Sequence, residues 1–321
     1  SSGNEHRLGA NEAPPAIISV FMGDMLTDMI DAIIHEKGNV SAEEEMMKLG
    51  VARIPEIKRD TTDRNRTSPF AFTGAKFEFR AVGSSQSIAF PVALLNAAVA
   101  EAIAEITDDL KAELKKTEKV DDAVFRIVRK VFKETTPVRF EGNNYSDEWV
   151  KEAAKRGLPN LKRSPEALSQ LVTKSSRKCL VGLGILTDEE LESRYHVRLE
   201  RYIKDILIEL HTLREMVDTL VLPAVFSYSS QLIESVSRAK SARLVAIPQV
   251  EAANALHKRI KELQKHRATL EKVITKAESM HDTLEECAAF LTHQGADAMA
   301  SVRGACDALE GLIDDDCWPL P

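Results

Sequence analysis

RNRTSPFAFTGAKFEFR, residues 64–80, is the stretch that decides the fold class and the candidate site. Its last five residues, KFEFR, alternate between polar and apolar side chains, as a half-buried β-strand does. The alternation predicts that Phe77 and Phe79 enter a core. The charged residues Lys76, Glu78 and Arg80 are predicted to share the opposite face of the strand.

The charges of this stretch have two interpretations. A carboxylate between two cations on a rigid strand suits a site that handles a metal ion and phosphate. Arg64 and Arg66 flank Asn65, so an extended backbone would point both guanidinium groups the same way, which is a common arrangement for binding phosphate or carboxylate oxygens. Alternating charges on a strand are nevertheless more often a solvated surface, and the pattern taken alone favours that interpretation.

A second stretch, GNEHRLGANEAPP at residues 3–15, changes this balance. Together the two stretches resemble the catalytic domain of glutamine synthetase. EHRLGANEAPP is similar to the substrate-arginine and glutamate-flap segment of that family, and residues 64–80 are similar to its phosphate-arginine and metal-glutamate segment. The helical second half and the ending IDDDCWPLP resemble the long, type III form, so the resemblance covers essentially the whole chain.

The resemblance implies an activity and a role for several charged residues. The activity is the ATP-dependent ligation of ammonia to glutamate, through a γ-glutamyl phosphate, to give glutamine. Arg7 matches the arginine that binds glutamate, and Glu12 matches the catalytic flap glutamate that accepts protons from ammonium. Arg66 matches a catalytic arginine that contacts phosphate, Glu78 a ligand of the second divalent metal ion, and Arg80 an arginine that faces the substrate and the transferring phosphoryl group.

Other positions match the family less closely. Lys76 stands where the short form of the family has an arginine near the nucleotide, and it keeps the charge without the two-pronged guanidinium. Arg64 is a candidate nucleotide contact with an equally open structural role. Ala71 occupies the place of a second phosphate arginine, so that role is vacant or filled from elsewhere. The implied cofactors are ATP, as a substrate, and Mg²⁺ or Mn²⁺.

Composition limits the class of protein. The 321 residues can hold two domains, and a net charge of −7 without a dense basic run argues against nucleic acid as a partner. No apolar stretch is expected to reach the roughly 18 residues that a membrane span needs. The four cysteines are scattered without metal-site spacing, which predicts reduced thiols in a cytoplasmic protein.

The first residues, Ser1-Ser2-Gly3, already lie inside a motif, so we expect the chain to be the C-terminal part of a longer protein. Two divalent ions need several carboxylates and a histidine. Only His6 and His35 precede the phosphate arginines, and neither lies in a matching ligand motif. The chain alone is therefore expected to be inactive.

The predicted fold class is α+β. Residues 1–163 are expected to form the C-terminal part of the catalytic domain, with antiparallel strands and packed helices, and residues 164–321 a helical C-terminal domain. The Ala- and Leu-rich segment Leu94–Leu110 predicts a buried helix, and Val120–Phe132 an amphipathic one. Asn143, Asn144 and Tyr145 favour a turn over a site. Helix starts are predicted by a Ser, or a Thr in a capping box, placed before the helix: Ser146, Ser164 and Thr187.

Two apolar runs with heptad-like spacing dominate the helical domain. The first comprises Leu199, Ile203, Ile206, Leu210, Leu213, Val217 and Leu220, and Pro223 is expected to break it. The second begins at Leu256 and passes through the polar positions Arg267 and His281. The two runs predict an antiparallel bundle or long hairpin, which serves either as a contact between subunits or as a plain structural bundle. The resemblance implies a homo-oligomer, with a ring assembly in the full-length enzyme.

A rival interpretation is a non-catalytic helical assembly protein derived from such an enzyme. The apolar runs would then carry its function, and Ala71 in place of an arginine would mark the decay of the catalytic half.

Overall fold

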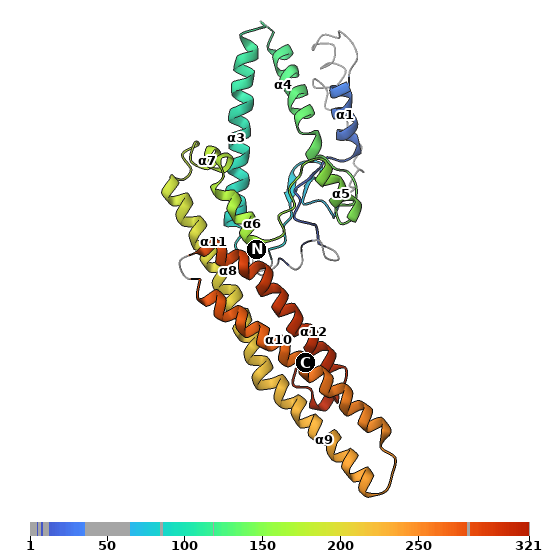
Figure 1. Ribbon diagram of the computed structural model, residues 1–321. Coiled ribbons are helices and arrows are strands. Elements are labelled where there is room, and N and C mark those ends of the chain that lie inside the picture. Colours follow the sequence, from blue (N-terminus) through green and yellow to red (C-terminus); the bar gives the residue numbers. More distant parts are fainter. Residues whose placement is uncertain are drawn as a thin grey trace. The chain divides into compact units, whose positions relative to one another are not determined.

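The computed structural model describes residues 5, 8, 13–35, 65–83, 86–117, 119–280 and 283–320 (Figure 1). The predicted site residues Arg7, Glu12 and Arg64, and the predicted polar position His281, lie outside the described residues. The chain divides into two compact units, Ser1–Leu191 and Glu192–Pro321. The fold is mainly helical with one small sheet, consistent with the predicted α+β class.

The sheet of the first unit has three short strands in the order β1 (Val20–Phe21), β2 (Phe70–Phe72) and β3 (Phe77–Phe79). β2 and β3 are antiparallel, with Ala71 opposite Glu78. β1 pairs with β2 in parallel, so the expectation of purely antiparallel strands is wrong for β1. Its partner strand follows almost 50 residues later, and a connection of that length is compatible with a parallel pairing.

The alternation of β3 is confirmed, but the predicted burial of its phenylalanines is not. Phe77 is 45% exposed and Phe79 is only partly buried. Phe77 stacks on Phe70 at a centroid distance of 5.2 Å and also lies against Phe72, at 5.3 Å. The aromatic side chains cover one another across two strands, and within the described residues no further layer buries them.

Most of the first unit is helical. Its helices are α1 (Asp24–His35), α3 (Ala89–Leu114), α4 (Val120–Glu134), α5 (Asp147–Lys155), α6 (Ser164–Ser169) and α7 (Lys174–Leu180), with 3₁₀ turns at Thr136–Val138 and Gln170–Val172. α4 buries Ala123 and Ile127, which confirms its predicted amphipathic character. α3 packs on α4 and on α7, and Ala97 joins a small core with Leu171, Leu180 and Leu191.

α3 corrects the prediction of a buried helix, because Ala97 is its one buried residue. An apolar row with spacings of three and four residues is exposed along the helix, and it includes Ile88, Val92, Val99, Ile103 and Ile106. Residues three or four apart lie on one helix face, so this row is a continuous apolar stripe. Within the described residues no element covers it.

The expectation that no segment is long enough for a membrane span is also wrong. Two helical segments, Ala89–Leu114 and Asp188–Ser241, are long and apolar enough by length and composition. The first segment reaches this length because its charges are concentrated beyond Glu101. Length and composition alone are weak evidence, since core helices of soluble proteins pass the same test.

A compact core around Trp149 stabilises the end of the sheet. Trp149 is buried with Ile17 and Ala153, and its ring stacks on Phe140 at a centroid distance of 3.8 Å. The guanidinium of Arg156 lies 5.3 Å from the centre of the Trp149 ring, within cation–π range. Ser146 accepts a hydrogen bond from the Trp149 amide at 3.2 Å, which confirms the predicted start of α5.

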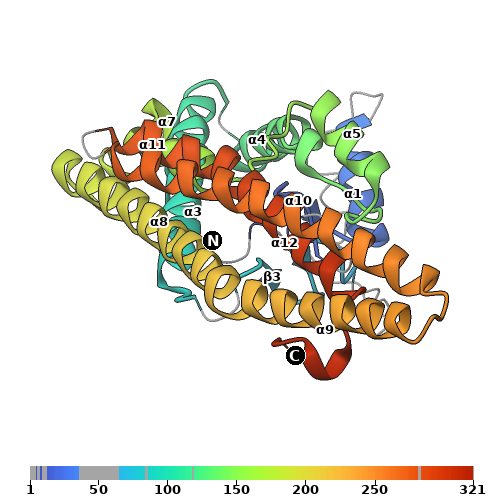
Figure 2. The same ribbon diagram turned by 60° about the horizontal axis from the view of Figure 1, so that its bottom comes forward.

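The second unit is a bundle of long helices (Figure 2). It contains most of α8 (Asp188–Met216), then α9 (Leu222–Ser241), α10 (Ile247–Glu278), α11 (Leu284–Phe290) and α12 (Ala296–Glu310), and it ends with a 3₁₀ turn at Asp315–Cys317. The capping box at the start of α8 is confirmed by reciprocal hydrogen bonds between Thr187 and Glu190. α10 packs against both α9 and α12, as the predicted antiparallel bundle requires.

A π-helical turn at Val217–Val221, η4, shifts the first apolar run. The Leu222 amide donates to the carbonyl of Val217, five residues earlier. The extra residue in this turn moves the buried position from Leu220, which is exposed, to Val221. The helical path continues through the turn into α9, so the expected break at Pro223 is wrong. The wide turn lies where proline leaves a carbonyl without its usual amide partner.

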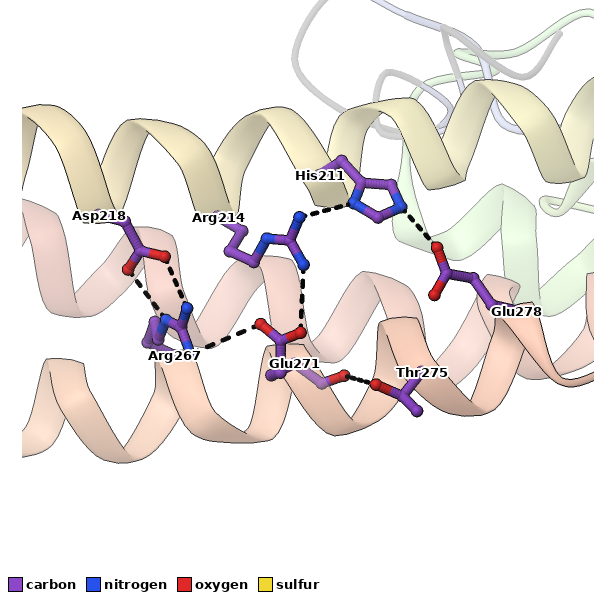
Figure 3. A network of polar contacts seen from close by, with 7 residues as sticks. All are labelled: His211, Arg214, Asp218, Arg267, Glu271, Thr275 and Glu278. Carbon is purple, nitrogen blue, oxygen red and sulfur yellow. Dashed lines mark hydrogen bonds and ion pairs between the residues drawn. The ribbon is translucent and has the colours of Figure 1, made fainter.

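Arg267 occupies its predicted polar position in the second run and pairs with Asp218 of η4 (Figure 3). Its Nε and Nη2 atoms donate to the two carboxylate oxygens at 2.9 and 2.6 Å. Arg214 bridges Glu271 of α10 and His211 of its own helix, and His211 contacts Glu278. These contacts bind α8 and η4 to α10, and they fix the register between the helices.

The loop between α9 and α10 contains a strained residue. Arg243 has φ = 59°, the only positive φ at a non-glycine residue within the described part of the chain. The Leu244 amide donates to the carbonyl of Ala239 at 2.9 Å, and the Arg243 amide to that of Lys240 at 3.0 Å. These two bonds form a Schellman motif, in which glycine usually occupies the left-handed position.

We therefore expect Arg243→Gly to stabilise the second unit by about 1 kcal/mol, because glycine adopts the left-handed conformation without a Cβ clash. Urea unfolding followed by circular dichroism measures this change. The matched control is Ala242→Gly, whose backbone has φ = −80° and gains nothing from glycine. An unchanged or lowered free energy of unfolding for Arg243→Gly would contradict the assignment of strain.

All four cysteines are free thiols, as predicted. Burial raises the pKa of Cys306 to about 11 and also raises the pKa of Cys287. Both side chains therefore act as apolar core residues of the bundle.

Candidate functional site

Three of the predicted site residues meet on β3. The Glu78 carboxylate lies between two cations, with Lys76 Nζ at 3.6 Å and Arg80 Nη2 at 3.1 Å. The side chain of Lys76 is 71% exposed, whereas those of Glu78 and Arg80 are 35% and 34% exposed. The expectation that the three charged residues share one face is thus confirmed. An exposed pair of this kind adds little stability, so the arrangement is not explained by stability alone.

Arg80 also connects β3 to the segment that carries the predicted phosphate arginine. Its Nη1 atom donates to the carbonyl of Asn65 at 3.3 Å, and its amide donates to the carbonyl of Pro69 at 2.7 Å. The Asn65 side chain accepts hydrogen bonds from the amide and the hydroxyl of Thr67, at 3.0 and 2.6 Å. The turn before β2 is therefore held directly against the charged end of β3.

Arg66 lies in this turn with an exposed side chain. Its carbonyl accepts a hydrogen bond from the Tyr145 hydroxyl at 3.4 Å. In the described part of the chain, no hydrogen bond or ion pair links the guanidinium of Arg66 with Glu78 or Arg80. The structure thus places the backbone of Arg66 next to the contact between Arg80 and Asn65, and it leaves the Arg66 side chain directed by solvent.

The loop at residues 141–145 positions this turn, a role that sequence reasoning missed. Asn144 is buried, its side chain accepts from Ser19 Oγ at 2.5 Å, and its amide donates to Thr67 Oγ1 at 2.9 Å. The Asn65 side chain donates to the carbonyl of Gly142 at 2.8 Å. A Cβ at Gly142 would lie 2.6 Å from the Phe140 ring, so glycine is required there. The residue types predicted a turn, but nothing local identified its partner segment.

Glu141 has a second structural role at the start of α1. Its carboxylate accepts hydrogen bonds from the amides of Met22 and Gly23, at 3.1 and 2.9 Å, and from Thr27 Oγ1 at 2.9 Å. A carboxylate at this end of a helix satisfies free amides and complements the helix dipole. A shallow cavity of about 430 Å³ lies beside it, lined by Thr27, Asp31, Thr136, Pro137, Arg139, Glu141 and Arg156. None of the predicted site residues lines that cavity.

Glu5 anchors the stretch that carries Arg7 and Glu12. Its carboxylate accepts a hydrogen bond from the Ser164 amide at 2.5 Å and lies 3.9 Å from Arg163. Ser164 was predicted to cap α6, yet Arg163 is the N-cap residue and Glu5 supplies the acceptor. On the other side of the stretch Ala13 is buried. The segment between these anchors is thus fixed at both ends, as a loop that closes over a site must be.

The described residues do not supply a complete metal site. No cluster of three or more His, Cys, Asp or Glu side chains occurs among them in a geometry that could hold a metal ion. Glu78 is a single carboxylate with two cationic neighbours, and divalent ions take several oxygen ligands. A metal ion at Glu78 would need further ligands from polypeptide outside the described residues.

Comparison with known proteins gives consistent matches. Residues 123–240 match the family model described as the glutamine synthetase C-terminal domain. The chain is 39% identical over 331 residues to a glutamine synthetase of Bacteroides fragilis and 40% identical over 332 residues to a type-3 glutamine synthetase of Dictyostelium discoideum. A glutamine synthetase of Butyrivibrio fibrisolvens is 36% identical over 338 residues. These alignments cover 99–100% of this chain and 44–45% of each relative, so the chain spans less than half the length of the relatives it matches.

Proposed function

The chain belongs to the glutamine synthetase family, and we propose from this premise that it is part of an enzyme that forms glutamine from glutamate, ammonia and ATP. The observation that carries the proposal is the cluster of Lys76, Glu78 and Arg80, held against the turn of Arg66 in the positions that the family resemblance assigns to phosphate and metal binding. The protein is proposed to be cytoplasmic and to use Mg²⁺ or Mn²⁺.

The proposed reaction has two steps. A γ-carboxylate oxygen of glutamate attacks the γ-phosphorus of ATP, the bond to the bridging oxygen of ADP breaks, and a γ-glutamyl phosphate forms. Ammonia then attacks the acyl carbon and displaces phosphate to give glutamine. The first step collects negative charge on the phosphoryl oxygens, and preorganised cations such as Arg66 and Arg80 stabilise it.

Arg7 and Glu12 are proposed to act at the other end of the substrate. The fork of a guanidinium group binds a carboxylate with two hydrogen bonds, and Arg7 is assigned to glutamate on that ground. Ammonium must lose a proton before it attacks, and the Glu12 carboxylate is proposed to take it. The same segment would exclude water from the acyl phosphate, and the anchors at Glu5 and Ala13 suit a loop that closes over a site.

The site is proposed to be completed by polypeptide beyond the matched span. Two observations support this. The described residues hold one candidate carboxylate, Glu78, where two divalent ions need several ligands. The apolar stripe of α3 is exposed to a degree that is unusual for a folded domain. The longer relatives have the additional chain length to supply both the ligands and a cover.

The function is tested by assaying glutamine and phosphate release by the full-length protein with glutamate, ammonium, ATP and Mg²⁺. We expect ATP-dependent glutamine formation by the full-length protein and none by the purified 321-residue chain. A full-length protein that folds and binds ATP but forms no glutamine would favour the non-catalytic helical assembly protein. Glutamine formation by the 321-residue chain alone would contradict the proposal that the site is incomplete.

A further inference from the structure

The far end of the α9–α10 hairpin is an exposed apolar and basic surface. We define the hairpin tip as residues 235–250. Leu244, Val245 and Ile247 are 66%, 79% and 61% exposed, although they are large apolar side chains next to one another. In both ribbon views the loop that joins α9 to α10 lies beyond the end of α12 (Figures 1 and 2). Such an apolar cluster at the end of a hairpin indicates a binding surface.

The tip also lacks a core of its own. In α9 the last buried residue is Ser229, and in α10 the first is Leu256. Between them, Ala246 is the one buried residue. Two helices that bury so little apolar surface gain little stability from each other. A partner that covers the tip would supply the missing apolar contact.

The charge of the tip selects the kind of partner. Residues 235–250 contain Arg238, Lys240 and Arg243 and no acidic residue. Arg238 pairs with Glu234, and no ion pair or hydrogen bond of the Lys240 or Arg243 side chains is recorded in the described part of the chain. Arg243 keeps its charge in a left-handed conformation that glycine would adopt more easily. The tip therefore presents positive charge around an apolar centre.

The complementary surface is present on the same unit. We define the acidic end as residues 304–320, which contain Asp307, Glu310, Asp314, Asp315 and Asp316 and no Lys or Arg. Glu310 and the three consecutive aspartates are exposed, and Leu312 beside them is 41% exposed. The acidic end thus combines negative charge with an apolar side chain, the inverse of the tip. Within the described residues, no hydrogen bond or ion pair joins the two surfaces of one chain.

We propose that the hairpin tip docks on the acidic end of a second copy of this chain. A two-fold pair satisfies both contacts at once, because the tip of each copy meets the acidic end of the other. Opposite charges fix the register, and the contact of Leu244, Val245 and Ile247 with the apolar part of the acidic end supplies the buried area. This interaction is independent of the proposed ligase activity.

Charge exchange between the two surfaces tests the proposal. The tip variant carries Lys240→Glu and Arg243→Glu, and the end variant carries Asp315→Lys and Asp316→Lys. Asp314 stays unchanged because its carboxylate accepts from the Asp316 amide and caps the last turn. Sedimentation velocity of the 321-residue chain over a concentration series measures association. We expect a dimer for the unmodified chain, monomers for each variant alone at the same concentration, and a dimer again when the two variants are mixed.

Two further variants separate the apolar contribution from general effects. Replacing Leu244, Val245 and Ile247 with serine is expected to weaken dimerisation at least 10-fold without changing the circular dichroism spectrum. Ile208→Ser, an equally exposed apolar position on α8 (63%), is the matched control and should leave dimerisation unchanged. The proposal is overturned if the unmodified chain stays monomeric, or if either charge variant dimerises alone as well as the unmodified chain. Tip-dependent binding of a monomeric chain to anionic lipid vesicles would also overturn it, because the occupant would then be a membrane.

Discussion

Trp149→Ala is expected to destabilise the first unit by about 3–5 kcal/mol, the usual cost of removing a buried aromatic side chain. Trp149 is buried, stacks on Phe140 and lies under the guanidinium of Arg156. Truncation leaves a cavity beneath the loop at residues 141–145, which holds the turn of Arg66. Urea unfolding gives the free energy, and hydrogen exchange identifies the unit that loses protection.

Two matched variants sharpen this prediction. Val99→Ala removes apolar atoms from an exposed position of the same unit, and its effect should stay within about 0.5 kcal/mol. Trp149→Phe keeps an aromatic ring and removes the indole N–H, which is buried without a hydrogen-bond partner. It should therefore cost much less than the alanine variant. Similar losses for alanine and phenylalanine would show that the ring stack does not stabilise this core.

Local patterns in the sequence predicted the elements that depend on neighbouring residues. The alternation of KFEFR gives β3 and places Lys76, Glu78 and Arg80 together, and Thr187 and Glu190 form the expected capping box. The polar position Arg267 within an apolar run indicated a partner on another helix, which is Asp218. In each case the interaction follows from spacing along one element.

The missed features depend on segments far apart in the chain. Glu5 caps α6 from a distance of 159 residues, and Asn144 holds Ser19 from 125 residues away, so no local pattern contains both partners. The η4 turn inserts one residue into an apolar run whose spacing looks regular, and Leu220 and Val221 are both plausible core residues by type. The exposure of α3 and of Phe77 could not be predicted, because an apolar side chain says nothing about which segment covers it.

Glu78→Gln in the full-length enzyme is expected to lower turnover on the order of 100-fold and to raise the concentration of Mg²⁺ or Mn²⁺ needed for half-maximal activity. An amide keeps the shape of the side chain and removes the negative charge that a divalent ion requires. Loss of a group that stabilises a charged transition state has an effect of this order. Glutamine formation as a function of metal concentration measures both quantities.

Lys76→Gln is the comparison on the same strand. Lys76 is highly exposed and lies 3.6 Å from Glu78, so it modulates the field at the carboxylate through solvent. We expect less than about a 10-fold loss of turnover and little change in metal dependence. Glu105→Gln removes an exposed carboxylate that is also paired with a lysine, Lys178, and should have no effect on either quantity. If Glu78→Gln resembles Glu105→Gln, then Glu78 is one more solvated charge and not a ligand. If it separates from both controls, the strand carries the metal site.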